Sequence, residues 1–139
     1  MYLAALTERI RRAGLPNLPM PLALDVTADS SPGQTFDGIF SANTLHIMSW
    51  KVVETFFSRL SQLTCDSAVL CIYGPFNYNG QFSSASNAAF DASLKSRDPL
   101  MGIRDIEQVL ALAQLQGFSL QQDCAMPANN RLLWFIKNV

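Results

Sequence analysis

The order of the secondary-structure elements predicts an α/β fold, with a mostly parallel sheet, helices on its faces and an antiparallel pair of strands at its end. Segments with helical and strand-like apolar patterns alternate along 139 residues, a length that fits one domain, residues 1–139. Ser67–Tyr73 is nearly continuous in apolar residues, as in a parallel strand covered on both faces. Met126–Asn130, between the last two strand-like segments, is too short for a crossover, so those strands should pair antiparallel.

The front of the chain predicts a helix and two strands. The opening helix has apolar residues at helical spacing and is ended by Gly14 and Pro16. Leu22–Val26 is apolar enough for a short strand, and residues 27–35 have the composition of a loop. Phe36–Phe40 is a second apolar segment and suits a buried strand.

The rest of the chain continues the alternation. Ser49 is a plausible N-cap for a helix whose apolar side chains share one face. The loop Gly74–Gly80 follows the clearest strand, and a serine-rich helix is expected over Ser84–Lys95. A further helix ends at Gly117, and the two closing strands are Phe118–Ala125 and Arg131–Lys137.

Ligands of such sheets bind beyond the carboxyl ends of the strands. This rule alone selects three places in the sequence: Asp25, the segment Ser41–His46 and the loop Gly74–Gly80. We therefore expect a binding site to be built from them.

The composition excludes several function classes. Charged residues make up 15% of the chain, the net charge is −1 and the basic residues form no cluster, so nucleic acid is not an expected partner. The longest apolar run, Ala68–Tyr73, is far short of the roughly 20 residues that span a membrane. One histidine and three cysteines without CxxC spacing predict no metal site and reduced, packed thiols. Charges near the N-terminus come too early for a signal peptide, so we expect a cytoplasmic protein.

Several motifs from Phe36 onward resemble those of a known class of enzymes. The segment Phe36–Ile47, FDGIFSANTLHI, resembles the fourth-strand motif of class I S-adenosylmethionine (SAM) methyltransferases. Together with four later segments it resembles a family of uncharacterised methyltransferase-like proteins, classed as a domain of unknown function. These segments are Tyr73–Gly80, Phe90–Pro99, Gly102–Asp105 and Met126–Arg131. The resemblance runs from about Leu15 to the C-terminus, and it implies a Rossmann-like three-layer sandwich with SAM as the cofactor.

The sequence departs from this family at its front. The family pattern begins with a strand, a glycine-rich turn of the type Glu-x-Ala-x-Gly-x-Gly that approaches the methionine part of SAM, and a second strand whose terminal acid holds the ribose. No two of the seven glycines have G-x-G spacing. The resemblance therefore implies a truncated domain, in which the first strand, Leu22–Val26, corresponds to the family's third.

The missing strands would leave an open edge. In the strand order that the resemblance implies, 3-2-1-4-5-7-6, they lie beside Phe36–Phe40, and their loss exposes an apolar edge that invites pairing. Either Leu22–Val26 moves across to pair there, or two copies of the chain join edge to edge or exchange elements. The low charge fraction favours a homodimer by either route.

Three polar residues follow predicted strands where the resemblance places the cofactor. Asp25 would accept a hydrogen bond from the adenine amine; alternatively, it is an ordinary loop carboxylate. Asn43 and His46 would line the methyl-transfer side of the pocket. His46 is also the candidate catalytic base, because an imidazole titrates near neutral pH. The alternative is a histidine that the backbone satisfies and that does no chemistry.

The candidate substrate-binding residues lie in the later motifs. They are Tyr73, Phe76, Asn77, Tyr78, Arg97, Arg104, Asn129 and Asn130. The first four mix aromatic and amide groups, which suits either a small-molecule pocket or a packed turn. The two arginines bind an anionic substrate or form structural ion pairs with their neighbouring aspartates. The two asparagines lie near the same pocket in the family arrangement, or serve only the turn.

Two functions remain open at this point. The first is a SAM-dependent methyltransferase-like protein of unknown substrate that does not catalyse alone, since the loop that positions the cofactor is absent. The second is a non-catalytic, homo-oligomeric module for small-molecule binding or interaction.

Overall fold

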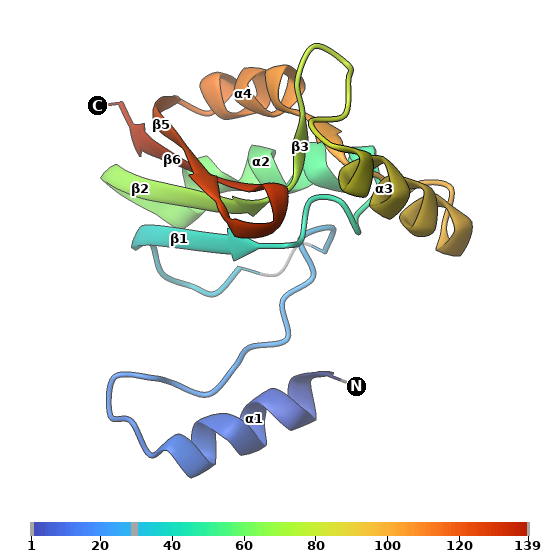
Figure 1. Ribbon diagram of the computed structural model, residues 1–139. Coiled ribbons are helices and arrows are strands. Elements are labelled where there is room, and N and C mark those ends of the chain that lie inside the picture. The colour runs from blue at the N-terminus through green and yellow to red at the C-terminus, as the bar shows by residue number, and fades with distance from the viewer. Residues whose placement is uncertain (1, 29–30, 139) are drawn as a thin grey trace.

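The computed structural model describes residues 2–28 and 31–138. Helices and strands alternate along it, as the sequence predicts (Figure 1). The elements are α1 (Tyr2–Ala13), β1 (Phe36–Ala42), α2 (Trp50–Leu63), β2 (Thr64–Gly74), β3 (Phe76–Asn77), α3 (Ala85–Arg97), β4 (Arg104–Asp105), α4 (Ile106–Leu115), β5 (Phe118–Met126), a 3₁₀ turn (Pro127–Asn129) and β6 (Asn130–Lys137).

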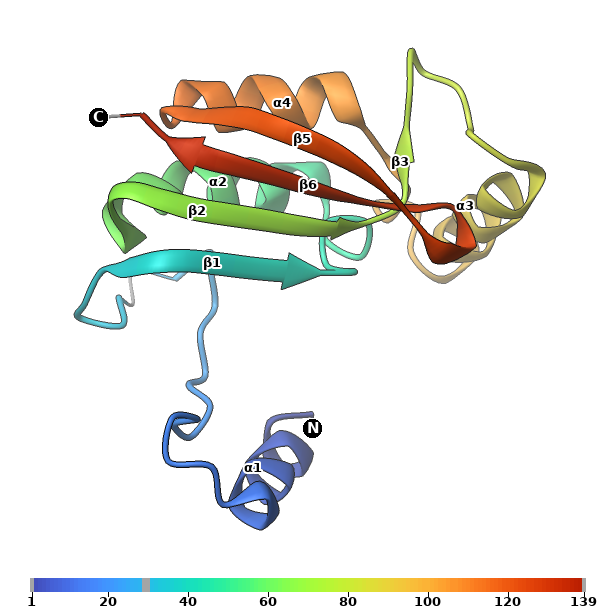
Figure 2. The ribbon, with the colours of Figure 1, turned by 60° about the vertical axis from the view of Figure 1, so that its left-hand side comes forward.

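The main sheet is mixed. Its strands lie in the order β1-β2-β6-β5, with β1 parallel to β2 and the other two pairings antiparallel (Figure 2). The predicted closing hairpin is confirmed, and β6 lies between β2 and β5. β3 and β4 form a separate short parallel pair beyond the end of β2. The sheet has fewer parallel pairings than the sequence predicts, because the expected strand Leu22–Val26 does not form.

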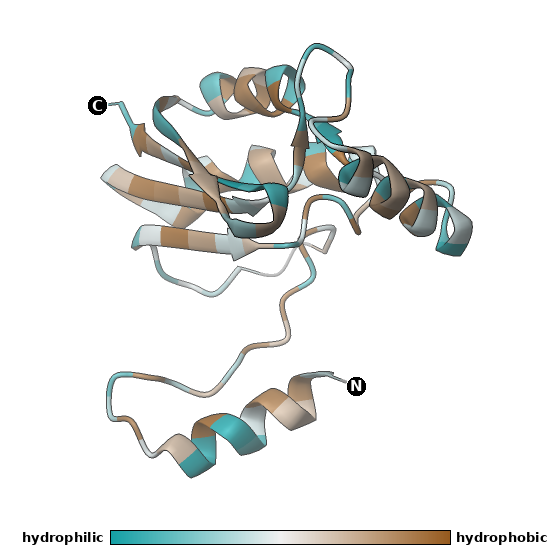
Figure 3. Ribbon diagram, in the orientation of Figure 1, coloured by the Kyte–Doolittle hydropathy of each residue, from teal (hydrophilic) through white to brown (hydrophobic). Residues whose placement is uncertain are grey.

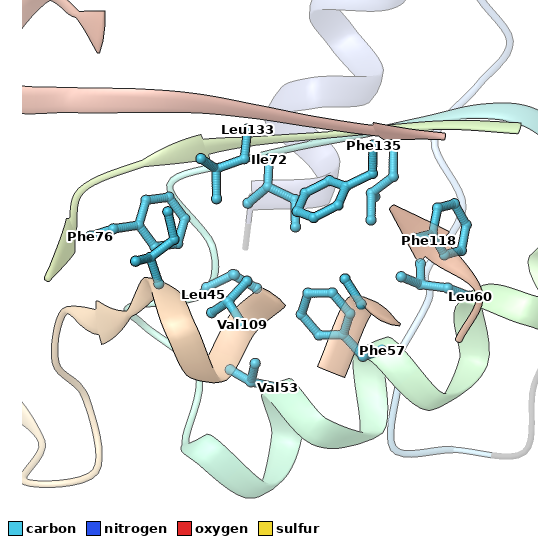
Figure 4. Packing of buried hydrophobic residues seen from close by; sticks show 13 residues of the cluster. Leu45, Val53, Phe57, Leu60, Ile72, Phe76, Val109, Phe118, Leu133 and Phe135 are labelled. Atoms are coloured by element: carbon cyan, nitrogen blue, oxygen red, sulfur yellow. The ribbon is translucent and has the colours of Figure 1, made fainter. Parts of the chain in front are cut away.

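One face of the sheet packs against α2 and α4 and forms the core. Side chains alternate along β2, so that Ala68, Leu70 and Ile72 point into this core. Phe57 from α2 and Phe135 from β6 are buried in it (Figure 4). Full burial of each such side chain contributes roughly 1.5–3 kcal/mol.

The opposite face of the sheet is less completely covered. Paired residues share a face, so Cys71 of β2 lies beside Trp134 of β6 and Phe40 of β1. Cys71 and Trp134 are half-buried, and Phe40 is 69% exposed. Of the three layers that the resemblance implies, the described part of the chain therefore shows two clearly: the sheet, and the layer formed by α2 and α4.

The segment Leu22–Val26 is irregular and exposed. Leu22 is 66% exposed, and the carboxylate of Asp25 accepts hydrogen bonds from the backbone and side chain of Thr27. A strand needs a neighbour for its backbone hydrogen bonds, and among the described residues β1 pairs with β2 alone. The predicted strand is therefore wrong, and of the two alternatives for the edge of Phe36–Phe40, pairing with Leu22–Val26 is not found.

Helix α1 stands away from the sheet in both views (Figures 1 and 2). Its apolar residues recur at helical spacing, and brown and teal segments alternate along it in Figure 3. Ile10 is its buried residue, whereas Leu3 and Leu6 remain exposed. The opening helix is thus confirmed, but most of its apolar stripe is without cover.

Ser49 caps α2 as predicted: its hydroxyl accepts a hydrogen bond from the backbone N–H of Val52 at 3.3 Å. We expect Ser49→Ala to lower the free energy of unfolding by about 1 kcal/mol, because the first turn of the helix loses this acceptor. Urea denaturation followed by circular dichroism measures the change. Ser58→Ala on the exposed side of the same helix is the matched control, and an equal loss in both variants would contradict the capping role.

Candidate functional site

A cavity of about 500 Å³ lies beyond the carboxyl ends of β1 and β2, at the edge where the topology places a ligand. It is bounded by the turn after β1, the residue after β2, the first turns of α3 and the turn between β5 and β6. Its lining residues are Asn43, His46, Pro75, Ser86, Asn87, Phe90, Ala128, Asn129 and Asn130. The structure thus brings together four of the residues predicted from the sequence, namely Asn43, His46, Asn129 and Asn130.

Asn43 forms the turn that carries the chain from β1 into the cavity wall. Its φ of 53° is a left-handed conformation that asparagine tolerates better than most residues. Its backbone N–H donates to the carbonyl of Tyr73 at 2.8 Å, which joins the ends of the two parallel strands. A side chain at Gly74 would meet Asn43 Oδ1 at 3.8 Å and His46 Nδ1 at 3.9 Å, so these two polar atoms converge on the same place.

His46 is 6% exposed, and its ring contacts Phe90 edge to face, with 5.3 Å between the ring centroids. Burial lowers the pKa of His46, and the positive charges of Arg104 and Arg97 lower it further. The imidazole is therefore neutral at pH 7 and able to accept a proton. Its backbone carbonyl accepts from the N–H of Gly102 at 3.0 Å, which ties its loop to the segment after α3.

Arg104 holds the loop that carries His46. Its Nε donates to the carbonyl of Leu45 at 3.2 Å, and its Nη2 donates to the carbonyls of Leu100, at 2.9 Å, and Met48. The guanidinium also lies 5.9 Å from the centre of the Trp50 ring. Arg104 does not line the cavity, and its hydrogen bonds place it in the backbone framework of the site rather than on a ligand.

Helix α3 also lines the cavity, and none of its lining residues was predicted from the sequence. Ser84 caps the helix, and one turn later Asn87 is 4% exposed, with Nδ2 donating to Ser83 Oγ at 3.0 Å and to the carbonyl of Asn129 at 3.3 Å. Asn129 returns a bond from its Nδ2 to Ser86 Oγ at 3.1 Å. The sequence could have indicated Asn87 as a site residue, because it is a polar residue that shares the buried face of the helix with Leu94.

The turn between β5 and β6 supplies the last wall. Ala128 and Asn129 both have a positive φ, of 60° and 57°, so the backbone reverses within a few residues. The amide of Asn130 donates to the carbonyl of Pro127 at 3.2 Å. The asparagines of this turn therefore stabilise the turn and also line the cavity, so both roles considered for them from the sequence are found.

The aromatic segment after β2 does not line the cavity. Tyr73 pairs with Ala42 and Leu132 on the sheet face away from the core. Phe76 is part of the core, and buried Asn77 donates to the carbonyl of Ile103 at 3.4 Å. The hydroxyl of Tyr78 donates to Asp123 at 2.5 Å, and burial, together with this bond, raises the pKa of Tyr78 to about 12.

The remaining predicted residues also lie outside the cavity lining. Arg97 is exposed near the end of α3, and Asp25 is held by Thr27. Asp91, which was not among the residues predicted from the sequence, is a buried carboxylate that accepts from the N–H of Ile103 at 2.8 Å and pairs with Lys95 at 2.6 Å. It lies on the same buried helix face as Asn87, where a charged residue signals a specific partner.

Within residues 2–28 and 31–138, no group of three or more histidine, cysteine, aspartate or glutamate side chains could hold a metal ion. In the same part of the chain, no helix is long and apolar enough to cross a membrane. The three cysteines are free thiols, but the expected packing is not found, because Cys65 is exposed and Cys71 and Cys124 are only half-buried.

The fold is shared with methyltransferases of known structure. A putative O-methyltransferase from Nostoc punctiforme superposes with a TM-score of 0.81 over 97% of this chain and 42% of its own, at 15% identity. PigF, in a structure with SAH, gives 0.79 over 97% and 40%, also at 15% identity. The S-adenosylmethionine-dependent methyltransferase SibL gives 0.75 over 95% and 39%, at 18% identity. The chain thus spans about two-fifths of the length of these structures.

These likenesses establish the class: an α/β domain with the Rossmann-like, class I methyltransferase fold. The chain itself belongs to the DUF938 family, described as a protein of unknown function, whose pattern matches residues 2–137.

His46 is the single histidine of the chain, so its ring signals in an NMR titration are unambiguous. We expect them to report a pKa below the ordinary value of about 6.5, because the ring is buried and faces positive charge. Arg104→Gln should move the pKa upward, whereas Arg12→Gln on exposed α1 should leave it unchanged. A wild-type pKa at or above the ordinary value would contradict this account.

Proposed function

We propose that this chain is a SAM-dependent methyltransferase-like protein whose cavity takes the small molecule to be methylated, and that it does not catalyse methyl transfer alone. The observation that carries the proposal is the convergence of Asn43 and His46 in a cavity at the carboxyl ends of parallel strands. The methyltransferase fold of the chain supports the same reading.

His46 supplies the one titratable group among the cavity-lining residues. Because its imidazole is neutral, it can take a proton from a hydroxyl or amine that enters the cavity. Arg104 keeps the loop of His46 in place through backbone carbonyls. His46 is thus the candidate catalytic base, and Arg104 is a positioning residue.

The described residues do not fit SAM as a whole. Asn43 and His46 offer polar groups on one side, but no pair of glycines offers the G-x-G turn that lets backbone approach such a cofactor. Asp25, proposed for the adenine, is bound to Thr27 and outside the cavity lining. This mismatch supports the proposal that the chain alone is inactive.

Calorimetric titration of the protein with SAM and with SAH tests the cofactor part of this proposal. We expect no saturable heat at ligand concentrations up to about 1 mM, because the chain offers only one side of a cofactor site. Asn43→Ala is titrated in parallel to identify heat that arises at the cavity. Tight one-site binding that Asn43→Ala abolishes would show a complete cofactor site and would contradict the proposal.

A second candidate function is a non-catalytic, homo-oligomeric binding module. The exposed edge of β1 favours it, since no strand of residues 2–28 and 31–138 pairs with the outer side of β1, and Phe40 on this strand is 69% exposed. In this proposal two copies of the chain cover each other's edge, and the small-molecule cavity is retained.

Size-exclusion chromatography with light scattering tests the dimer. We expect a mass of twice 15.3 kDa for the wild type and a shift toward 15.3 kDa for Phe40→Glu, because a charge at the edge opposes pairing. Leu115→Glu, at an exposed position on α4, is the matched control and should remain dimeric. A monomeric wild type at high concentration would overturn the dimer proposal.

A further inference from the structure

The lining of the cavity contains no formally charged side chain at neutral pH. Four of the nine lining residues are asparagines, one is a serine and one is the neutral His46. Phe90, Pro75 and Ala128 are apolar. The chemistry that this cavity can recognise is therefore decided by amide groups and by flat apolar contacts.

One amide of the lining has its nitrogen fully engaged by the protein, because both N–H groups of Asn87 are donated, to Ser83 Oγ and to the carbonyl of Asn129. A backbone carbonyl can only accept a hydrogen bond, so the bonds to the carbonyls of Asn129 and Pro127 require the nitrogen sides of Asn87 and Asn130 at those contacts. Asn129 likewise donates its own nitrogen to Ser86. Asn129 and Asn130 each keep one N–H donor besides the carbonyl oxygen, whereas Asn87 keeps only its oxygen, which can accept.

The oxygen of Asn87 opens into the cavity. Among the described residues, only Asn77 has a fully buried side-chain oxygen without a partner. Asn87 Oδ1 has no hydrogen bond within the described part of the chain, and it is therefore accessible, although the residue as a whole is 4% exposed. Because Asn87 is a lining residue, a ligand can reach this oxygen there.

The nearby charges are already engaged with protein groups. Asp91 binds the N–H of Ile103 and pairs with Lys95, and Arg104 donates to three carbonyls. Arg131 pairs with Asp123 at 2.7 Å. At the start of α3, the hydroxyl of Ser84 accepts from the N–H of Asn87, which satisfies one of the donors that an anion would use.

We propose that the cavity binds an uncharged small molecule that carries at least one hydroxyl or N–H donor on a flat ring. The donor reaches the free oxygen of Asn87, and the ring lies against Phe90 and Pro75. A charged ligand would lose its hydration without gaining an opposite charge. The inference rests on the proposed function, because it names the class of molecule for the same cavity.

Three ring compounds of similar size separate these chemistries: resorcinol with two donors, its dimethyl ether with none, and meta-hydroxybenzoate with a negative charge. Each is titrated into the protein while the His46 ring signals are followed by NMR. We expect resorcinol to shift these signals saturably, and the other two to bind at least about tenfold more weakly, since a tenfold change corresponds to the loss of about one good hydrogen bond.

Two variants test the location. Asn43→Gly removes a lining amide at a position whose φ of 53° glycine also adopts, and it should weaken resorcinol binding by several-fold. Asn79→Gly removes an amide at the same φ outside the cavity lining and should leave binding unchanged.

Binding of meta-hydroxybenzoate or of the dimethyl ether as tight as that of resorcinol would overturn the inference, as would the absence of binding by all three or equal effects of the two variants. The readout is separate from the titration with SAH. SAH binding bears on the cofactor site, whereas the three compounds bear on the cavity alone, so either proposal can fail without the other.

Discussion

The guanidinium of Arg104 is the interaction on which the geometry of the site depends. It donates to backbone carbonyls of the loop after β1 and of the segment after α3, and so ties these two segments together. The N–H of Gly102 on the carbonyl of His46 closes the same arrangement from the other side. Arg104 and Gly102 thus hold the loop of His46 in position, although neither residue lines the cavity. An arginine that the sequence offered as a ligand group is instead part of the framework, because a half-buried guanidinium needs several acceptors and these carbonyls supply them.

The fold was predictable where local pattern and tertiary packing agree. The apolar face of α2, the cap at Ser49 and the continuous run in β2 each specify an element and the side that it buries. Leu22–Val26 shows the limit of this reasoning. Its composition suits a strand, but a strand forms only beside another edge, and the sequence of a segment does not contain its neighbour.

The site was predictable to a similar extent. Topology alone located Asn43 and His46, because the ends of parallel strands share one edge of the sheet. Asn87 and Phe90 were missed, since their contribution depends on how α3 lies against the closing hairpin, and that placement comes from long-range bonds such as the one from Asn87 to Asn129. The aromatic segment after β2 was proposed for the pocket but turned inward, where its apolar area is buried with the core.

The walls of the cavity differ in how strongly they are tied to the rest of the molecule. On α3, Asn87 lies on the face that also buries Asp91 and Leu94, so a change of helix register there would disturb the core. The turn at Ala128 and Asn129 buries no residue, and its bond from Asn87 goes to a backbone carbonyl, which does not depend on the side chain at that position. Over evolutionary time, substitutions in this turn can alter which molecule the protein prefers while leaving its foldability intact. Homologues that bind different ligands would then differ in the sequence of the hairpin turn before they differ in the sequence of α3.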